Sequence, residues 1–234
     1  MKLQKLYSYV RRAMDDYSMV DDGDKIAVGV SGGKDSLALL YALSGLRKFY
    51  PKKFDIVALT VNLGFKNQDF NLIKDFCKNL DVECKIIDTE IGDIVFHKRK
   101  ESNPCSLCAK MRKGSLNDVA KKMGCNKVAY AHHRDDMIET MLMSLIYEGR
   151  FHCFNPVTYL DRMELNVIRP MMYVSEMDVI GFANKYNLPV AKNPCPVDGH
   201  TKREYIKTLV RQLNRENPNC KDRLFTAVLN GGFD

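Results

Sequence analysis

The chain has 234 residues, 45% of them hydrophobic, which suffices for the core of one α/β domain with additions but not for two full domains. Lysine and arginine outnumber aspartate and glutamate by 36 to 29, so the net charge of +7 favours an anionic partner such as ATP or a nucleic acid. No apolar run approaches the roughly 20 residues of a membrane span, and the charged start is unlike a signal peptide. We therefore expect a cytoplasmic protein without a membrane partner.

Eight cysteines are present. In the reducing cytosol, closely spaced cysteines indicate metal binding or catalysis rather than disulfides.

The first predicted element is a helix over residues 2–19, because apolar residues recur there at helical spacing. It belongs to an N-terminal segment, residues 1–22, that precedes the main domain. Its basic side chains form either the solvated face of a packing helix or a contact with RNA phosphates.

The central motif is a turn between a buried strand, residues 25–30, and an apolar helix that begins at Leu37. Its sequence is Ser31-Gly32-Gly33-Lys34-Asp35-Ser36. The two glycines allow close approach of a ligand, and the start of the helix offers unpaired N–H groups, so the turn predicts a phosphate site. It is not a Walker A loop, and the alternative is an ordinary glycine-containing turn.

Strands and helices then alternate. A strand over 54–61 ends at Asn62, a helix covers 69–80, and a third strand covers 82–88. This alternation predicts a parallel sheet with helices on both faces, whose ligands bind at the carboxyl ends of the strands.

The pattern weakens between residues 89 and 103, where the basic run 97–100 is either a solvated loop or an RNA contact. Cys105 and Cys108 then open a helix that runs to about Met123. Two cysteines three residues apart at a helix start can share one metal centre, although two structural cysteines would give the same pattern.

A fourth strand, residues 126–131, leads into His132, His133, Asp135 and Asp136. Two adjacent carboxylates beside a phosphate site favour Mg²⁺, whereas the alternative is the ordinary acidic start of a helix. His133 faces either the site or the core.

The last third contains a predicted hairpin (157–160 and 165–169), a helix from Ser175 to about Tyr186, and a basic helix over 202–214. Cys195 lies between two prolines, which suggests a rigidly placed ligand or nucleophile rather than a plain loop cysteine. Only a short apolar stretch near Phe225 and Val228 is expected after that.

The central turn resembles the pyrophosphate loop of the ATP pyrophosphatases, which split ATP into AMP and pyrophosphate. Together with other stretches it makes the chain similar, over about residues 25–210, to the tRNA thiolation enzymes of the 2-thiocytidine and 2-thiouridine synthetase types. The matching stretches are Val61-Asn62-Leu63, Cys105 to Cys108 followed by Arg112, His132 to Asp136, Ile168-Arg169-Pro170, and Cys195-Pro196 followed by Arg203.

The resemblance implies an α/β fold with a parallel, doubly wound, Rossmann-like sheet of the adenine-nucleotide α-hydrolase type. The domain would span residues 23–200, and residues 201–234 would form a basic helical tail. In this family, ATP adenylates the C2 oxygen of a pyrimidine in tRNA, and sulfur then displaces AMP. The absence of four-cysteine zinc modules favours the 2-thiocytidine branch, and Ala131 stands where the family usually has glycine.

By the same resemblance, a 4Fe–4S cluster is held by Cys105, Cys108 and Cys195, which with Asp35 form the catalytic set. Sulfur would come from a cysteine desulfurase or from sulfide, Mg²⁺ would bind Asp135 and Asp136, and a homodimer is expected. The residues expected to bind ATP are Ser31, Gly32, Gly33, Lys34, Asp35, Ser36, Val61, Asn62, His132 and Asp136.

Three other readings remain open. Cys105 or Cys195 could carry a persulfide without a cluster. The chain could be related to the tRNA lysidine synthetases, a reaction that needs no placed cysteines. It could also be a nucleotide-binding zinc module without catalysis.

Overall fold

We describe a computed structural model, in which residues 1–65, 68–99, 104–191, 195 and 202–231 can be placed. The strands of that part of the chain form one six-stranded sheet in the order β3-β2-β1-β4-β6-β5. All neighbouring strands are parallel except β5, which pairs with β6 as an antiparallel hairpin at one edge. The strands are β1 (Asp24–Gly29), β2 (Phe54–Asn62), β3 (Glu83–Asp88), β4 (Lys127–Ala129), β5 (Val157–Leu160) and β6 (Leu165–Ile168).

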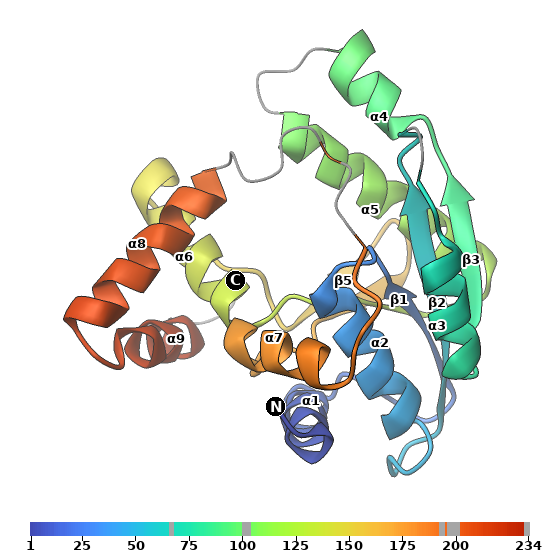
Figure 1. Cartoon of the computed structure of the whole chain (residues 1–234), viewed down its shortest axis with the longest axis horizontal. Helices are drawn as coiled ribbons and strands as arrows, with labels where there is room; N and C mark the ends of the chain where they lie inside the picture. The colour runs from blue at the N-terminus through green and yellow to red at the C-terminus, as the bar shows by residue number, and fades with distance from the viewer. Residues whose placement is uncertain (66–67, 100–103, 192–194, 196–201, 232–234) are drawn as a thin grey trace.

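Helices cover both faces of this sheet, and two further helices lie beside it (Figure 1). Their bounds are α1 (Leu3–Asp16), α2 (Lys34–Leu46), α3 (Asn71–Asn79), α4 (Ile91–Asp93), the π-helix η1 (Ile94–Lys98), α5 (Pro104–Lys122), α6 (Arg134–Glu148), α7 (Glu176–Lys185), α8 (Lys202–Glu216) and α9 (Cys220–Asn230).

The apolar strands explain the two-sided arrangement. Alternate residues of the buried run in β1 point to opposite faces, so Ile26 and Val28 join the larger core while Ala27 joins a smaller one. The smaller core is covered by α5 through Leu116 and Ala120. The predicted doubly wound sheet is therefore confirmed, and the loop after β1 leaves the sheet at its carboxyl edge.

The N-terminal helix is a packing helix. Leu6, Val10 and Met14 are fully buried in the larger core. The basic side chains Arg11 and Arg12 form ion pairs with acidic residues one turn further along α1, at 3.4 and 3.3 Å. These contacts favour the packing interpretation over an RNA contact.

The C-terminal segment contains a second helix whose bounds the sequence did not indicate. Within the expected helical tail, where only a short apolar stretch stood out, α9 forms because Phe225 and Val228 bury one face of a helix that packs against α6. Residues 91–98 also differ, since they form the short helix α4 and η1 rather than an irregular loop. Ion pairs of Lys98 with Asp93 and Glu90 are made within that turn of helix.

Among the residues that the structure describes, no helix combines the length and the hydrophobicity needed to cross a membrane.

Candidate active site

The loop from Ser31 to Ser36 is held open by its own hydrogen bonds. The Ser36 hydroxyl accepts from the backbone N–H of Ser31 at 3.1 Å and donates to the carbonyl of Gly33 at 2.9 Å. Gly32 has φ +81°, a conformation that residues other than glycine rarely adopt. No side chain in the described part of the chain caps α2, so its first N–H groups can receive an anion, as the sequence predicts.

Two charged side chains extend from this loop. The Lys34 ammonium is 3.0 Å from a carboxylate oxygen of Asp35 and 3.4 Å from Glu176 on α7. The other Asp35 oxygen, Oδ1, is buried and has no hydrogen-bond partner among the described residues. A buried carboxylate oxygen without a partner is costly, and an arriving cation or donor would relieve that cost.

His133 faces this unpaired oxygen. Its Nδ1 accepts from the backbone N–H of Asp136 at 3.3 Å, so the neutral ring carries its proton on Nε2, which is 3.7 Å from Asp35 Oδ1. Asp136 in turn accepts from the backbone N–H of His133 at 3.0 Å, which completes a capping box at the start of α6. Of the two orientations left open by the sequence, His133 therefore adopts the one toward the site.

The adjacent carboxylates of α6 have different surroundings. Asp135 is buried, and its oxygens are occupied by Lys221 of α9 at 2.7 Å and by the backbone N–H of Glu176 at 2.8 Å. Burial alone would raise the pKa of Asp135, but these hydrogen bonds and the nearby charges hold that pKa below its usual value. Asp136 is more open and lies 3.5 Å from Arg203. A magnesium ion would thus reach Asp136 more easily than Asp135.

Of the three predicted cysteine ligands, Cys108 is near enough to both Cys105 and Cys195 to feel their charge. Cys105 is exposed and Cys108 buried on the first turns of α5, and Cys195 is half-buried. Burial raises the pKa of Cys108, Arg112 opposes this, and the neighbouring thiols of Cys195 and Cys105 raise that pKa further. Three neighbouring thiols are the donor set that an iron–sulfur cluster requires, so these residues fit such a group in chemistry. Among the described residues, however, no three Cys, His, Asp or Glu side chains are close enough to hold a metal ion, so the thiols would have to close around it.

The last described residue before Cys195 is attached to the nucleotide loop. The backbone N–H of Ala191, four residues before Cys195, donates to the Gly32 carbonyl at 3.0 Å. A Cβ on Gly32 would lie 3.1 Å from the Ala191 Cβ and 3.3 Å from the Ile73 side chain. The predicted prolines on either side of Cys195 lie outside the described residues.

An aromatic and cationic group lies at the ends of β4 and β6. The Phe154 ring lies 4.6 Å from the His132 ring and 5.0 Å from the Arg169 guanidinium. Burial and the charges of Arg169, Lys113 and Arg203 lower the pKa of His132 to about 3, so this imidazole is neutral at physiological pH. Burial likewise lowers the pKa of Arg169 to about 10.

Val61 and Asn62 end β2 at the same edge of the sheet as the loop. The Asn62 side chain donates to Asp88 at 2.9 Å and accepts from the Gly64 N–H at 2.9 Å. Its amide therefore shapes the turn after β2, and its backbone carbonyl accepts from the N–H and the hydroxyl of Thr89 at 3.1 and 2.7 Å.

Sequence reasoning did not assign a site role to Glu176 or Lys207. Glu176 was regarded as part of a helix start and Lys207 as one of several charges on a basic helix. For Lys207 a signal was present in the sequence: Arg203 and Lys207 are four residues apart and thus lie on one face of α8.

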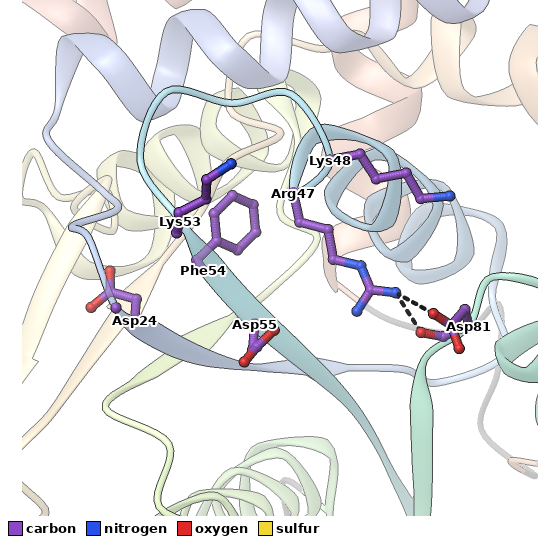
Figure 2. A pocket seen from close by; sticks show the side chains of 8 residues that line it. Asp24, Arg47, Lys48, Lys53, Phe54, Asp55 and Asp81 are labelled. Carbon is purple, nitrogen blue, oxygen red and sulfur yellow. Dashed lines mark hydrogen bonds and ion pairs between the residues drawn. The ribbon is translucent and has the colours of Figure 1, made fainter.

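A pocket of about 480 Å³ lies at the opposite, amino edge of the sheet (Figure 2). Figure 2 shows Arg47 directed at Asp81, to whose carbonyl it donates, while the Phe54 ring lies between Lys53 and Arg47. No sequence motif maps to this pocket.

Comparison with known proteins is consistent with the site at the carboxyl edge. Residues 3–213 match the family model described as a PP-loop domain. The chain is 38% identical over 233 residues to the tRNA-cytidine(32) 2-sulfurtransferase of Geobacter sulfurreducens, covering 98% of this chain and 91% of that one. It is 36% identical to the protein of the same name from Pelobacter propionicus, covering 97% and 86%.

Two solved structures share the fold. The U34-tRNA thiolase NcsA from Methanococcus maripaludis, solved with its [4Fe-4S] cluster, superposes with a TM-score of 0.80 at 24% identity over 97% of this chain and 77% of that one. An NH3-dependent NAD synthetase from Campylobacter jejuni superposes with a TM-score of 0.53 at 17% identity, covering 98% and 93%. The fold and the loop thus define an ATP-using PP-loop protein. Within that class, the chain belongs to the family of the tRNA-cytidine(32) 2-sulfurtransferases.

Proposed function

We propose that this protein is an ATP-dependent tRNA sulfurtransferase that replaces the C2 oxygen of a cytidine with sulfur, at position 32 as in the relatives' name. The hydrogen bond between Gly32 and Ala191 carries the proposal, because it connects the phosphate loop to the segment that bears Cys195. One site can then hold both an activating nucleotide and a sulfur-handling group.

The nucleotide half of the reaction uses the loop. The phosphates bind the uncapped start of α2 and Lys34, while Ser36 keeps the loop open. We assign Mg²⁺ to Asp35 and Asp136, since Asp35 Oδ1 lacks a partner in the described structure and Asp136 is the more open of the two α6 carboxylates. Val61, Asn62 and His132 lie at the same edge, where the adenosine would bind.

The chemistry follows from this placement. The C2 oxygen of the cytidine attacks the α-phosphorus of ATP, and the bond to pyrophosphate breaks. A sulfur nucleophile then adds at C2 and the C2–O bond breaks, so that AMP leaves. Lys34 and the start of α2 stabilise the negative charge that develops on the phosphates. His133 Nε2 lies 3.7 Å from Asp35 Oδ1, so the imidazole borders the position that we assign to the metal.

The sulfur half uses the three thiols. Cys105, Cys108 and Cys195 would hold a 4Fe–4S cluster, which supplies an iron position without a protein ligand where sulfur from a desulfurase or sulfide can bind. Arg112 would offset part of the negative charge of such a group. We further propose that the protein acts in the cytoplasm, where tRNA is found, and that it forms a homodimer.

A cluster-free persulfide mechanism is the second candidate, and the exposure of Cys105 favours it. Iron and acid-labile sulfide are measured after anaerobic purification to separate the two. About four of each per chain supports the cluster, whereas active protein without iron supports the persulfide.

The main test is mass spectrometry of tRNA nucleosides from cells with and without the gene. We expect 2-thiocytidine to disappear with the gene and to return with the wild-type chain. An unchanged nucleoside profile would contradict the proposed function.

A further inference from the structure

Glu176 places a negative charge beside the phosphate loop. Its side chain is only 13% exposed, and its Oε1 lies 3.4 Å from the Lys34 ammonium. Although burial raises it, the pKa of Glu176 is held below its usual value by the hydrogen bond and charge of Lys207, by Lys34 and by His133. Glu176 is therefore ionised at the point where a polyphosphate would bind Lys34.

Lys207 from α8 shares the same carboxylate oxygen. Its ammonium donates to Glu176 Oε1 at 2.5 Å, a shorter contact than the one from Lys34. Two lysines from distant parts of the chain thus converge on one oxygen. When Lys34 turns to a phosphate, Glu176 keeps a cation only if Lys207 stays in place.

The position of Glu176 is fixed by more than this oxygen. Its backbone N–H donates to Asp135, which also binds Lys221, so the start of α7 cannot easily move away from the loop. α8 is held on the same side by Arg203, which lies 3.3 Å from Glu139 and 3.5 Å from Asp136. Figure 1 shows α8 alongside α6, with α7 next to α6.

We propose that Glu176 and Lys207 are a pair of positioning residues for the nucleotide phosphates: Glu176 orients Lys34 before ATP arrives, and Lys207 neutralises Glu176 once Lys34 has bound the phosphates. The inference rests on the proposed use of ATP. A carboxylate without a neutralising cation would repel the triphosphate bound beside it. Like charges a few ångströms apart in a partly buried site interact strongly. Lys207 therefore acts through Glu176 and need not touch the nucleotide.

The proposal predicts the sign of the coupling between Lys207 and Glu176 in ATP affinity, which a double-mutant cycle measures. ATP and AMP binding to the purified full-length chain are measured by calorimetry, without tRNA. Lys207→Met should weaken ATP binding about tenfold, which corresponds to about 1.4 kcal/mol, and should weaken AMP binding less because AMP lacks the β- and γ-phosphates. Glu176→Gln alone should weaken ATP binding by no more than about threefold, because Lys34 loses the carboxylate that orients it while the phosphates lose a repelling charge. The double variant should return to within about threefold of the wild-type affinity.

Three further variants keep the outcome interpretable. Lys207→Arg, which retains the charge, should bind ATP like the wild type, and Lys207→Gln replaces the methionine variant if that one does not fold. Arg211→Met removes an exposed charge one turn further along α8 and should have no effect.

Each result decides one point. Equal losses in Lys207→Met with and without Glu176→Gln would overturn the pair, as would equal losses for ATP and AMP. A wild-type chain that does not bind ATP would instead contradict the proposed function.

Discussion

The polar groups at the two ends of the sheet's strands differ in whether they have hydrogen-bond or ion-pair partners. At the amino edge, two of the charged side chains that line the pocket of Figure 2 already have partners: Arg47 donates to the backbone of Asp81, and Asp24 lies 2.8 Å from Lys127. At the carboxyl edge, Asp35 Oδ1 and His132 Nδ1 are buried without a hydrogen-bond partner in the described structure. The pocket at the amino edge therefore lies beside charges that are already paired, whereas the buried polar atoms without partners lie at the carboxyl edge.

This difference shows why an unpartnered polar atom indicates function better than an empty volume. A folded protein pairs nearly all of its buried polar atoms, so unpaired ones need an explanation. A bound metal ion or nucleotide would provide one at the carboxyl edge. The following predictions test whether the two edges differ in function as they differ in pairing.

The largest effect is expected at Cys195. Cys195→Ala should abolish tRNA thiolation while leaving ATP affinity within about twofold, because we assign this thiol to the sulfur half of the site. Cys153→Ala is the matched control: that thiol is buried, burial raises its pKa to about 11, and its hydrogen bond goes to the carbonyl of Met137. Thiolation assays and calorimetry on both variants measure this. Loss of ATP binding in Cys195→Ala would show that the assignment to the sulfur half is wrong.

The second prediction compares the two edges directly. Lys34→Met should lower kcat/KM for thiolation by about 10²- to 10³-fold, because it removes a cation from the phosphates in the transition state. Arg47→Met, at the amino-edge pocket, should leave kcat/KM unchanged. If the two variants lost activity equally, the contrast between the edges would carry no functional meaning.

The third prediction concerns stability. Lys221→Met should lower the free energy of unfolding by about 2 kcal/mol at pH 7, since it leaves the buried Asp135 carboxylate with only its backbone donor. The pKa of Asp135 is lowered in the folded chain, so this stabilisation is present above about pH 4 and is lost as the pH falls through the lowered pKa. Urea unfolding of both proteins at pH 7 and pH 3.5 should therefore show a gap that narrows on acidification. A gap that widens in acid would contradict the ion pair.

The smallest effect is expected for the stability of the amino edge. Arg47→Met should cost about 1 kcal/mol, because it removes hydrogen bonds to the backbone of Leu80 and Asp81 at the partly exposed end of α3. Thermal or urea unfolding measures the change. A loss as large as that of Lys221→Met would mean that this edge is more tightly coupled to the core than its contacts indicate.

Local pattern was sufficient for the sheet and the loop. The β-branched run before Ser31 and the apolar run after Ser36 each determine one element, so the strand–loop–helix unit follows from adjacent residues. Ser175 was likewise identified as a helix cap, and its hydroxyl accepts from the Asp178 N–H at 3.1 Å.

Contacts between side chains far apart in the sequence could not be predicted from local pattern. The long-range partners of Lys34 and Asp135 come from α7 and α9, and no spacing rule relates a residue in α6 to one 86 positions later. Within the expected helical tail, α9 was not identified as a separate helix, because its apolar positions are few and are buried only by packing against α6. The division of roles between Asp135 and Asp136 also depends on such distant partners.

The bond between Ala191 and Gly32 has a mechanical consequence. The main-chain oxygen that accepts from Ala191 belongs to Gly32, whose backbone adopts a left-handed conformation with φ +81°. A distortion of the phosphate loop at Gly32 would therefore act directly on Ala191, and a displacement of Ala191 would act on the loop. The loop that we assign to ATP and the backbone four residues before the proposed sulfur ligand Cys195 are thus linked by one main-chain hydrogen bond.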